Sequence, residues 1–180
     1  MNWFTADTHF GHKNVIPYCN RPFASVEEMD AELIRRWNFL VKPDDVVFHL
    51  GDFAFCGAIR AGIILSELNG LKVLIRGNHD RGYTDTKWKR LGFYEVKQSD
   101  FKTISGAPVR MSHFPFAGQE ADTRDFSKYQ LKDNGGWLLH GHVHEAWKQQ
   151  DKMINVGVDQ WAYAPVSEEE ISRILEGGNG

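Results

Sequence analysis

The sequence predicts an α/β (α+β) fold, on the basis of three observations. In the first half of the chain, short apolar runs that suit buried strands alternate with segments of helical periodicity. Each of these apolar runs leads into a polar residue with metal-binding chemistry. The second half contains more strand-like runs than helical patterns. Repetition of strand, polar residue and helix indicates a parallel sheet with helical crossovers.

The first half supplies the elements of that parallel sheet. The expected elements are strands at residues 3–6, 45–50 and 72–76 and helices at 25–41 and 57–68. The first helix opens on a capping box, in which Ser25 caps the N-terminus and Glu28 reaches back to it. The apolar side chains that recur at helical spacing, and so should face the core, are Met29, Leu33, Trp37 and Leu40.

The second half predicts a strand-rich region that ends in a helix. The expected strands cover residues 94–98, 101–104, 109–112, 137–140 and 153–158. The first three are expected to pair as a meander around turns at Asp100 and Gly106. A helix is expected over 167–175, where Ser167 and Glu170 repeat the capping-box pattern. Residues 114–136 are expected to form a long loop beside the functional site.

Length and composition indicate an ordinary globular chain. Its 180 residues are 42% hydrophobic and 25% charged, which suits one domain with a sizeable core. We expect that domain to span residues 1–176 and residues 177–180 to form a flexible tail. The net charge of -3 argues against extended nucleic-acid binding, although a nucleotide or a nucleic-acid end stays open as a substrate.

Compartment and membrane signals favour a cytoplasmic protein. Cys19 and Cys56 are too few for a disulfide framework, and we expect both as reduced thiols. The first residues lack a basic region followed by an apolar stretch, so a signal peptide is not expected. Spanning a bilayer takes about 20 apolar residues, and the apolar runs of this sequence are much shorter.

Short segments with oxygen and imidazole donors recur along the chain. They are Asp7-Thr-His9, Gly51-Asp52, Gly77-Asn-His-Asp80, Ser112-His113 and His140-Gly-His-Val-His144. Asp7, Asp52 and Asn78 come just after expected strands, so they should share the edge of the sheet where ligands bind in α/β folds. The glycines at 51, 77 and 141 would let the backbone turn sharply and approach a ligand closely.

This order of segments resembles the calcineurin-like metallophosphoesterase superfamily, whose pattern runs D-x-H, G-D, G-N-H-D/E, a lone H and G-H-x-H. The match runs from Asp7 to His144 and is specific for the superfamily rather than for a substrate. It implies a four-layer α-β-β-α sandwich, in which helices flank two mixed β-sheets. The opening segment over residues 4–23 is similar to small phosphoesterases of bacteria and phages.

The resemblance also implies a centre of two divalent metal ions. Two cations about 3.5–4 Å apart need a shared anion, and Asp52 is the expected bridging carboxylate. By resemblance, Asp7, His9 and His144 complete the first metal site. Asn78, His113 and His142 complete the second. These donors suit Mn²⁺, Fe or Zn²⁺, and we favour Mn²⁺.

Such a site is expected to hydrolyse phosphoesters by in-line attack of a metal-bridging hydroxide. His79 is the candidate to protonate the leaving group or to contact phosphate, because histidines change charge near neutral pH. Asp80 either orients His79 or caps the helix that follows. In the protein-phosphatase branch a further Asp and a phosphate-binding Arg follow the Gly-Asp pair, and residues 53–57 contain neither. This departure favours a phosphodiesterase.

Further residues are weaker candidates for contacts with substrate. His12 either contacts substrate or lies at the surface, and Arg21 and Arg124 are either phosphate contacts or solvated charges. His49 and His140 are interpreted as core histidines. The segment 155–159, which resembles one in small phosphoesterases, is interpreted as a turn held by Asp159. The aromatic residues available to stack on a base are Phe53, Phe55, Phe114 and Phe116.

The leading hypothesis is therefore a binuclear phosphodiesterase that acts on small, nucleotide-like substrates. The alternatives are a phosphomonoesterase for nucleotides or phosphoproteins and a non-catalytic metal-binding scaffold. The missing arginine counts against the phosphoprotein alternative. The scaffold is disfavoured because His79 and the whole ligand set are present. No membrane association is expected, and the oligomeric state is left open.

Overall fold

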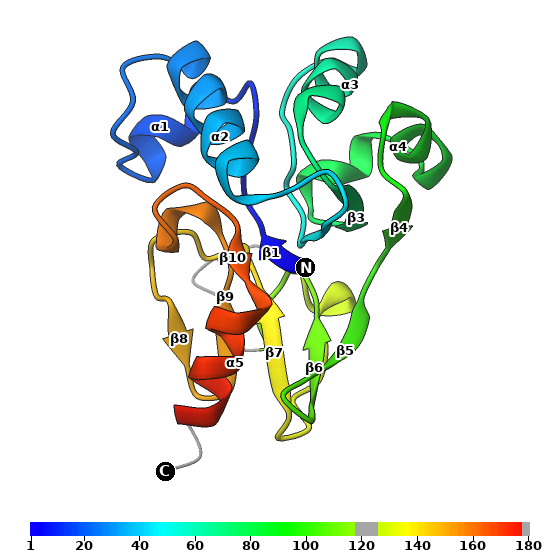
Figure 1. Cartoon of the computed structure of the whole chain (residues 1–180), viewed down its shortest axis with the longest axis vertical. Coiled ribbons are helices and arrows are strands. Elements are labelled where there is room, and N and C mark those ends of the chain that lie inside the picture. Colours follow the sequence, from blue (N-terminus) through cyan, green and yellow to red (C-terminus); the bar gives the residue numbers. More distant parts are fainter. Residues whose placement is uncertain (118–125, 178–180) are drawn as a thin grey trace.

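Two five-stranded β-sheets pack against each other in the computed structural model, which describes residues 1–117 and 126–177 (Figure 1). The strand order is β10-β1-β2-β3-β4 in the first sheet and β5-β6-β7-β9-β8 in the second. Each sheet contains parallel and antiparallel pairs, so both are mixed. The predicted α/β class with two mixed sheets is confirmed.

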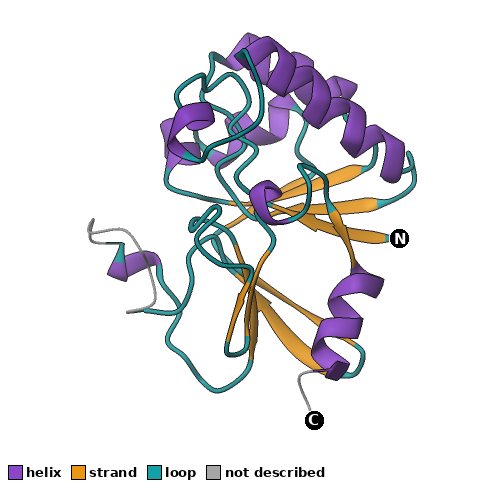
Figure 2. Ribbon diagram, turned by 90° about the vertical axis from the view of Figure 1, so that its left-hand side faces the viewer, coloured by secondary structure: helices purple, strands orange, loops and turns teal. Residues whose placement is uncertain are grey.

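The first sheet carries a layer of helices on its outer face (Figure 2). Its strands are β1 (Asn2–Thr5), β2 (Val46–His49), β3 (Leu71–Ile75), β4 (Glu95–Lys97) and β10 (Val166–Ser167). The helices are α1 (Val15–Tyr18), α2 (Val26–Leu40), α3 (Ala58–Glu67) and α4 (Asp85–Leu91). Trp37, Ile64 and Trp88 from three of these helices share one buried cluster with Val47 and Leu74 of the sheet. Burial of these apolar side chains is what holds the helices on the sheet.

Serine N-caps start two of the helices at the positions where the sequence predicts capping boxes. The Ser25 hydroxyl accepts a hydrogen bond from the Glu28 backbone N–H at 3.2 Å, and the Glu28 carboxylate accepts one from the Ala24 N–H at 2.7 Å. At the start of α5 (Glu168–Gly177), the Ser167 hydroxyl accepts from the Glu170 N–H at 3.1 Å. These bonds satisfy backbone donors that have no partner inside the helix.

The second sheet packs one face against the first. Its strands are β5 (Asp100–Ile104), β6 (Ala107–Met111), β7 (Trp137–His140), β8 (Gln149–Gln150) and β9 (Met153–Asn155). Val109, Leu139 and Ile154 join Phe4 of the first sheet in a core that Ile171 of α5 helps to close. Side chains alternate along a strand, and Leu138 and Met153 belong to a separate small cluster with Phe116. Loop residues therefore cover the outer face of this sheet.

One strand of the predicted meander belongs to the other sheet. The segment expected at 94–98 forms β4, which pairs in parallel with β3 rather than with β5. The crossover is provided by α4, a helix that was expected to follow Asp80 but whose bounds the sequence pattern did not indicate, and the Thr84 hydroxyl caps it by accepting from the Lys87 N–H at 3.2 Å. A parallel pair needs such a crossover, whereas a meander does not. The antiparallel β5–β6 pair around Gly106 forms as predicted.

The loops that bear the predicted site residues meet at one end of the two sheets. In the first sheet they follow β1, β2 and β3, and in the second they follow β6 and β7. Backbone bonds join them, from the Asp7 N–H to the Gly51 carbonyl and from the Gly141 N–H to the His113 carbonyl, each at 3.0 Å. The carboxyl ends of parallel strands thus form one edge, as expected for ligand binding in this fold class.

Two further expectations concern the chain's C-terminus and membranes. Gly177 ends α5, and the rest of the tail expected at 177–180 lies outside the described residues. Across residues 1–117 and 126–177, no helix has the length and apolar character that crossing a bilayer requires.

Candidate metal centre

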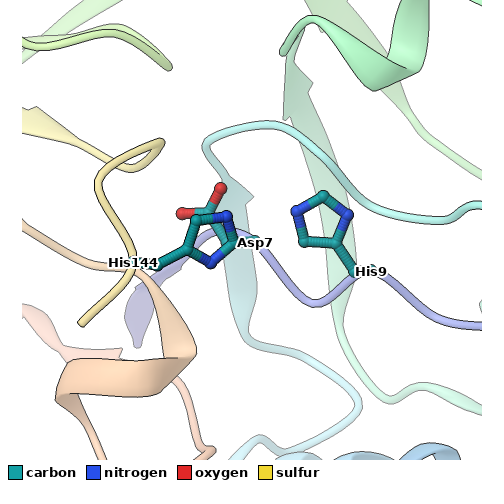
Figure 3. A group of neighbouring side chains, drawn as sticks. All are labelled: Asp7, His9 and His144. Atoms are coloured by element: carbon teal, nitrogen blue, oxygen red, sulfur yellow. The ribbon is translucent and has the colours of Figure 1, made fainter. Parts of the chain in front are cut away.

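Two groups of metal-binding side chains meet where these loops converge. Asp7, His9 and His144 each place one donor atom within 4.8 Å of the others (Figure 3). Asp7, Asp52 and His113 form a second group that meets the same limit. Asp7 and His9 come from the loop after β1, whereas His144 lies in the loop after β7. Loops of both sheets therefore contribute donors to one centre.

The remaining two predicted ligands lie against His113. The Asn78 side-chain oxygen is 3.1 Å from the His113 Nε2 atom, and the ring centroid of His142 is 5.2 Å from that of His113. All seven predicted ligands thus lie in the centre. Asp7 is common to both groups of donors, so the two groups adjoin at its carboxylate. The assignment of each ligand to one metal remains a prediction.

The backbone is held in an unfavourable conformation at five of the predicted ligands. Their φ angles lie between +46° and +74° at Asp7, His9, Asp52, His142 and His144. Non-glycine residues in this region cost about 1–3 kcal/mol each and persist where the surrounding structure imposes them. Strained backbone of this kind is common at functional sites. Here all five strained residues are predicted metal ligands.

Two of the predicted glycines leave room for the carboxylates. A Cβ atom on Gly77 would lie 2.1 Å from Asp52 Oδ1, and one on Gly141 would lie 2.4 Å from Asp7 Oδ2. Both distances are far below van der Waals contact, so no larger residue fits at either position. These glycines act through close approach to the donors, as the sequence predicts.

Buried donor atoms without partners indicate that the centre is built for a cation. Within the described part of the chain, Asp7 Oδ1 and both ring nitrogens of His9 are buried and make no hydrogen bond. Buried polar groups normally have partners, and each exception requires an explanation. A divalent cation would bind a lone pair of Asp7 Oδ1 and that of one His9 ring nitrogen, and a mixture of carboxylate, imidazole and amide donors suits a transition metal. The residues present therefore fit the group that the resemblance implies.

The charges of the carboxylates in the metal-free centre also fit a site built for a cation. Burial raises the pKa of Asp7. For Asp52 burial acts in the same direction, but His113, His9 and His79 outweigh it and hold the pKa of the carboxyl well below its usual value. The Asp52 Oδ2 atom lies 3.5 Å from His113 Nε2 and 3.6 Å from His9 Nε2. Asp52 is thus an ionised carboxylate surrounded by the imidazole side chains of His9, His79 and His113.

The pKa shifts of the ligand histidines differ in direction because their charged neighbours differ. Burial lowers the pKa of His9 well below its usual value, which leaves a neutral imidazole with a lone pair to donate. Burial would do the same at His113, but Asp52 outweighs it and raises the pKa to about 9. At His144, Asp7 and Asp159 outweigh burial and raise the pKa to about 11. A metal ion would displace the protons from these rings, so binding should release protons.

His79 lies at the rim of the centre. Its side chain is 29% exposed, and its Nε2 atom is 3.9 Å from Asp52 Oδ2. The His79 backbone N–H donates to Asp52 Oδ1 at 2.9 Å, which fixes the residue to the predicted bridging ligand. His12 is also at the rim, with its ring centroid 5.5 Å from that of His9 and 6.3 Å from that of His79. Both rings are placed where a substrate could reach them.

Asp80 has a position that neither sequence-based alternative anticipated. Its carboxylate accepts backbone N–H bonds from Asp52, Phe53 and Gly77 at 2.8–3.0 Å. Burial, followed by the nearby charge of Asp52, raises the pKa of Asp80 to about 6. Because its oxygen atoms bind these backbone groups, Asp80 joins the loops after β2 and β3, rather than capping a helix or holding the His79 ring.

Arg21 is buried inside the protein, which corrects the expectation that it contacts substrate phosphate or is solvated. Only 4% of the residue is exposed. Its guanidinium donates to the carbonyls of Asp7 and Thr8 at 2.7 and 3.1 Å and to both carboxylate oxygens of Asp159 at 2.8 and 2.9 Å. A buried guanidinium needs such partners to offset the loss of water.

Asp159 connects this arginine to the metal centre. Its Oδ2 atom is 3.1 Å from Nδ1 of His144, which leaves Nε2 of that ring available for a metal. Burial opposes ionisation of Asp159, but His144 and Arg21 outweigh it and lower the pKa. Carboxylates that bind the second nitrogen of a metal-ligating histidine fix the ring and increase its basicity. The sequence-based interpretation of 155–159 as a plain turn missed the contact of Asp159 with Arg21, because these two residues are 138 positions apart in sequence.

We expect Asp159→Asn to weaken metal binding by about 10–100-fold, because the neutral amide no longer orients and polarises His144. The same change leaves Arg21 without its buried countercharge and should lower the free energy of unfolding by about 3–5 kcal/mol. Titration calorimetry with Mn²⁺ and urea unfolding of the metal-free protein measure the two effects separately. A loss of stability with unchanged metal affinity would mean that Asp159 supports the fold alone.

The remaining candidates are placed as follows. His49 and His140 are fully buried, as interpreted from the sequence, and burial lowers the pKa of each to about 3. Among the aromatic candidates, Phe55 is 55% exposed, whereas Phe53, Phe114 and Phe116 are buried. Cys19 and Cys56 are free, and the Cys19 sulfur lies within 4.8 Å of donor atoms of His144 and Asp159. Arg124 lies outside the described residues.

Comparison with known proteins identifies relatives over nearly the whole chain. The model of the calcineurin-like phosphoesterase family matches residues 3–154. An uncharacterized protein of Methanocaldococcus jannaschii is 36% identical, with 98% of this chain and 92% of the relative covered. The gene 66 protein of Mycobacterium phage L5 is 33% identical, with 94% and 91% covered. The crystal structure of a protein of unknown function from Aquifex aeolicus has a TM-score of 0.75 at 26% identity, with 97% and 98% covered.

Proposed function

Because the chain belongs to the calcineurin-like phosphoesterase family and is thus a metal-dependent phosphoesterase, we propose that it is a phosphodiesterase with two metal ions. Its substrates are small phosphodiesters, nucleotide-like in size and charge. The observation that carries the two-metal proposal is the pair of donor groups that share Asp7. We propose Mn²⁺ as the working metal, because the donors are oxygen and imidazole nitrogen atoms, and a cytoplasmic location for a protein with two free thiols.

The proposed ligands divide between the two metal positions. Asp7, His9 and His144 would hold one ion and Asn78, His113 and His142 the other, with Asp52 between them. Two bound cations would neutralise phosphoryl oxygens and lower the pKa of a water molecule. The strained, buried loops keep the donors in place before the metal arrives, so binding needs little rearrangement.

His79 is proposed to act on the leaving group. Its ring is partly exposed at the rim, and its backbone is tied to Asp52, so substrate phosphorus at the metals would lie next to this imidazole. A protonated ring would donate its proton to the departing oxygen and prevent an unstable alkoxide from forming. His12, on the same side of the centre, is proposed to contact the substrate.

A diester is favoured over a monoester by the charge around the rim. A hollow lies beside His79, and its lining in the described structure includes no arginine or lysine. Arg76 and Arg81, which flank the donor Asn78 in sequence, have partners of their own: Arg76 binds Asp85, and the Arg81 guanidinium lies over the Tyr129 ring. Arg21 is bound to Asp159. A monoester carries a second negative charge that usually calls for a cationic partner, whereas a diester carries one charge that the metals themselves would meet.

We expect metal-stripped protein with added Mn²⁺ to cleave bis-p-nitrophenyl phosphate at least about tenfold faster, in kcat/KM, than p-nitrophenyl phosphate. A tenfold ratio corresponds to about 1.4 kcal/mol of differential transition-state binding. Release of p-nitrophenol measures both rates, and metal stoichiometry is determined in parallel. Faster monoester cleavage would replace the diesterase by a phosphomonoesterase. Stoichiometric metal binding without hydrolysis of either compound would contradict both.

A further inference from the structure

A hollow of about 420 Å³ opens beside His79 on the side of the first sheet. Three aromatic residues contribute to its wall, Phe55 from the loop before α3 and Tyr83 and Trp88 from the segment that includes α4. His79 belongs to both this wall and the rim of the metal centre. The hollow therefore adjoins the residue that is proposed to act on the leaving group.

Phe55 is held as an exposed aromatic surface at the mouth of this hollow. More than half of the residue, 55%, is accessible to solvent. Its ring stands edge-on to two imidazoles, with centroids 4.5 Å from His12 and 5.5 Å from His79. The Phe55 backbone N–H donates to the Phe10 carbonyl at 2.9 Å. A bridge between Phe10 and Ala54 holds the same segment, so the ring is positioned before any ligand binds.

The residues that line the hollow favour an uncharged, planar ligand. Its residues in the described structure are aromatic, small or apolar apart from His79, with neither carboxylates nor Arg or Lys side chains among them. Aromatic side chains bind other rings by stacking or edge contacts, and such binding tolerates many ring types because each ring has a π face. A charged or strongly hydrated group would lose water here without gaining partners.

We propose that this hollow is a subsite for a planar aromatic ring carried by the leaving alcohol, either the base of a nucleoside or an aryl group. The proposal rests on the phosphodiesterase function proposed above, since His79 would face the oxygen that joins this ring system to phosphorus. It names the substrate class that the metal centre alone does not define. Phe55 forms the contact surface, and Gly57 and Gly82 leave the space that the ring fills.

Two variants alter the subsite without touching the metal donors. Phe55→Ala removes the aromatic surface. Gly82→Leu adds a side chain where a new Cβ meets no heavy atom within 4 Å, so it fills the hollow without forcing the fold. Tyr94→Ala removes an aromatic ring that is 69% exposed outside the hollow. Gly177→Leu places a leucine in similarly open space at the end of α5. These two are the matched controls.

The first test compares adenosine 2′,3′-cyclic phosphate with the corresponding cyclic phosphate of methyl riboside, which has the same reacting centre and no base. We expect Phe55→Ala and Gly82→Leu to raise KM for the adenosine compound about tenfold or more. KM for the compound without a base, and kcat for both, should change less than twofold. Equal effects on the two compounds, or equal effects of the control variants, would overturn the subsite.

The second test needs neither metal nor turnover. Binding of adenosine and of p-nitrophenol to the metal-free protein is measured by saturation-transfer NMR, and both signals should fall in Phe55→Ala and Gly82→Leu. Loss of the adenosine signal alone would restrict the subsite to nucleosides, and loss of the p-nitrophenol signal alone to aryl groups. Unchanged signals for both would overturn the proposal. Ring binding that depends on Phe55 in a protein without diesterase activity would instead refute the proposed function and leave the subsite standing.

Discussion

Asp52→Asn is expected to abolish metal-dependent hydrolysis, with a loss of about 10³-fold or more in kcat/KM. Asp52 is a buried anion whose Oδ2 atom lies 3.5–3.9 Å from nitrogen atoms of His9, His79 and His113. Asparagine keeps the shape and removes the charge that two neighbouring cations would share. Metal-centred charge stabilisation is worth several kcal/mol, and each 1.4 kcal/mol is tenfold in rate.

The fold should survive this substitution, which makes the result interpretable. Asp52 has φ of +56°, a region that asparagine tolerates better than most residues. Its Oδ1 atom accepts the His79 N–H, and an amide oxygen can accept the same bond. Asp151→Asn is the matched control, because Asp151 also has positive φ, +49°, and lies exposed in a turn of the second sheet.

Metal binding and turnover are measured on the same preparations. We expect titration calorimetry with Mn²⁺ to show weakened or incomplete loading in Asp52→Asn and normal loading in Asp151→Asn. Thermal unfolding of the metal-free proteins checks that both retain the fold. Near-normal activity with two metal ions bound in Asp52→Asn would remove Asp52 from the proposed bridge and leave Asp7 as the carboxylate shared by both positions.

The parts of the fold that could be predicted are those with a local signal. The strands before Asp7, Asp52 and Asn78 are short apolar runs, and two helices begin at the serine N-caps that the sequence pattern predicts. The pairing of β4 could not be predicted in this way. Its three residues fit either sheet, and its place is decided by packing of α4, whose Trp88 is buried in the core of the first sheet.

The same difference between local sequence signals and long-range contacts applies to the candidate site. The predicted ligands could be identified because each is part of a short motif, and the structure brings them together. The contacts of Arg21 with Asp159, and of Asp80 with the N–H groups of Asp52 and Phe53, join residues 27 to 138 positions apart. Local sequence patterns do not predict contacts between residues so far apart. A buried arginine needs a carboxylate, but an arginine in an irregular segment reads equally well as a surface charge until its burial is known.

His79→Ala is expected to retain metal binding and to lower kcat by about 10²–10⁴-fold on diesters with poor leaving groups. His79 is not among the proposed ligands, and its backbone bond to Asp52 is independent of the side chain. With p-nitrophenol as leaving group the loss should be much smaller, because a stable phenolate needs little protonation. A series of diesters that differ in leaving-group pKa measures this dependence directly.

His12→Ala is the control for that series, because its ring also lies at the rim, 6.3 Å from the ring of His79. If His12 contacts substrate without moving a proton, its removal should lower the rate by a similar factor on every leaving group. The slope of rate against leaving-group pKa should therefore steepen in His79→Ala alone. If the two variants gave parallel lines, the role of His79 would be to hold the phosphoryl group, and protonation of the leaving oxygen would have to come from solvent.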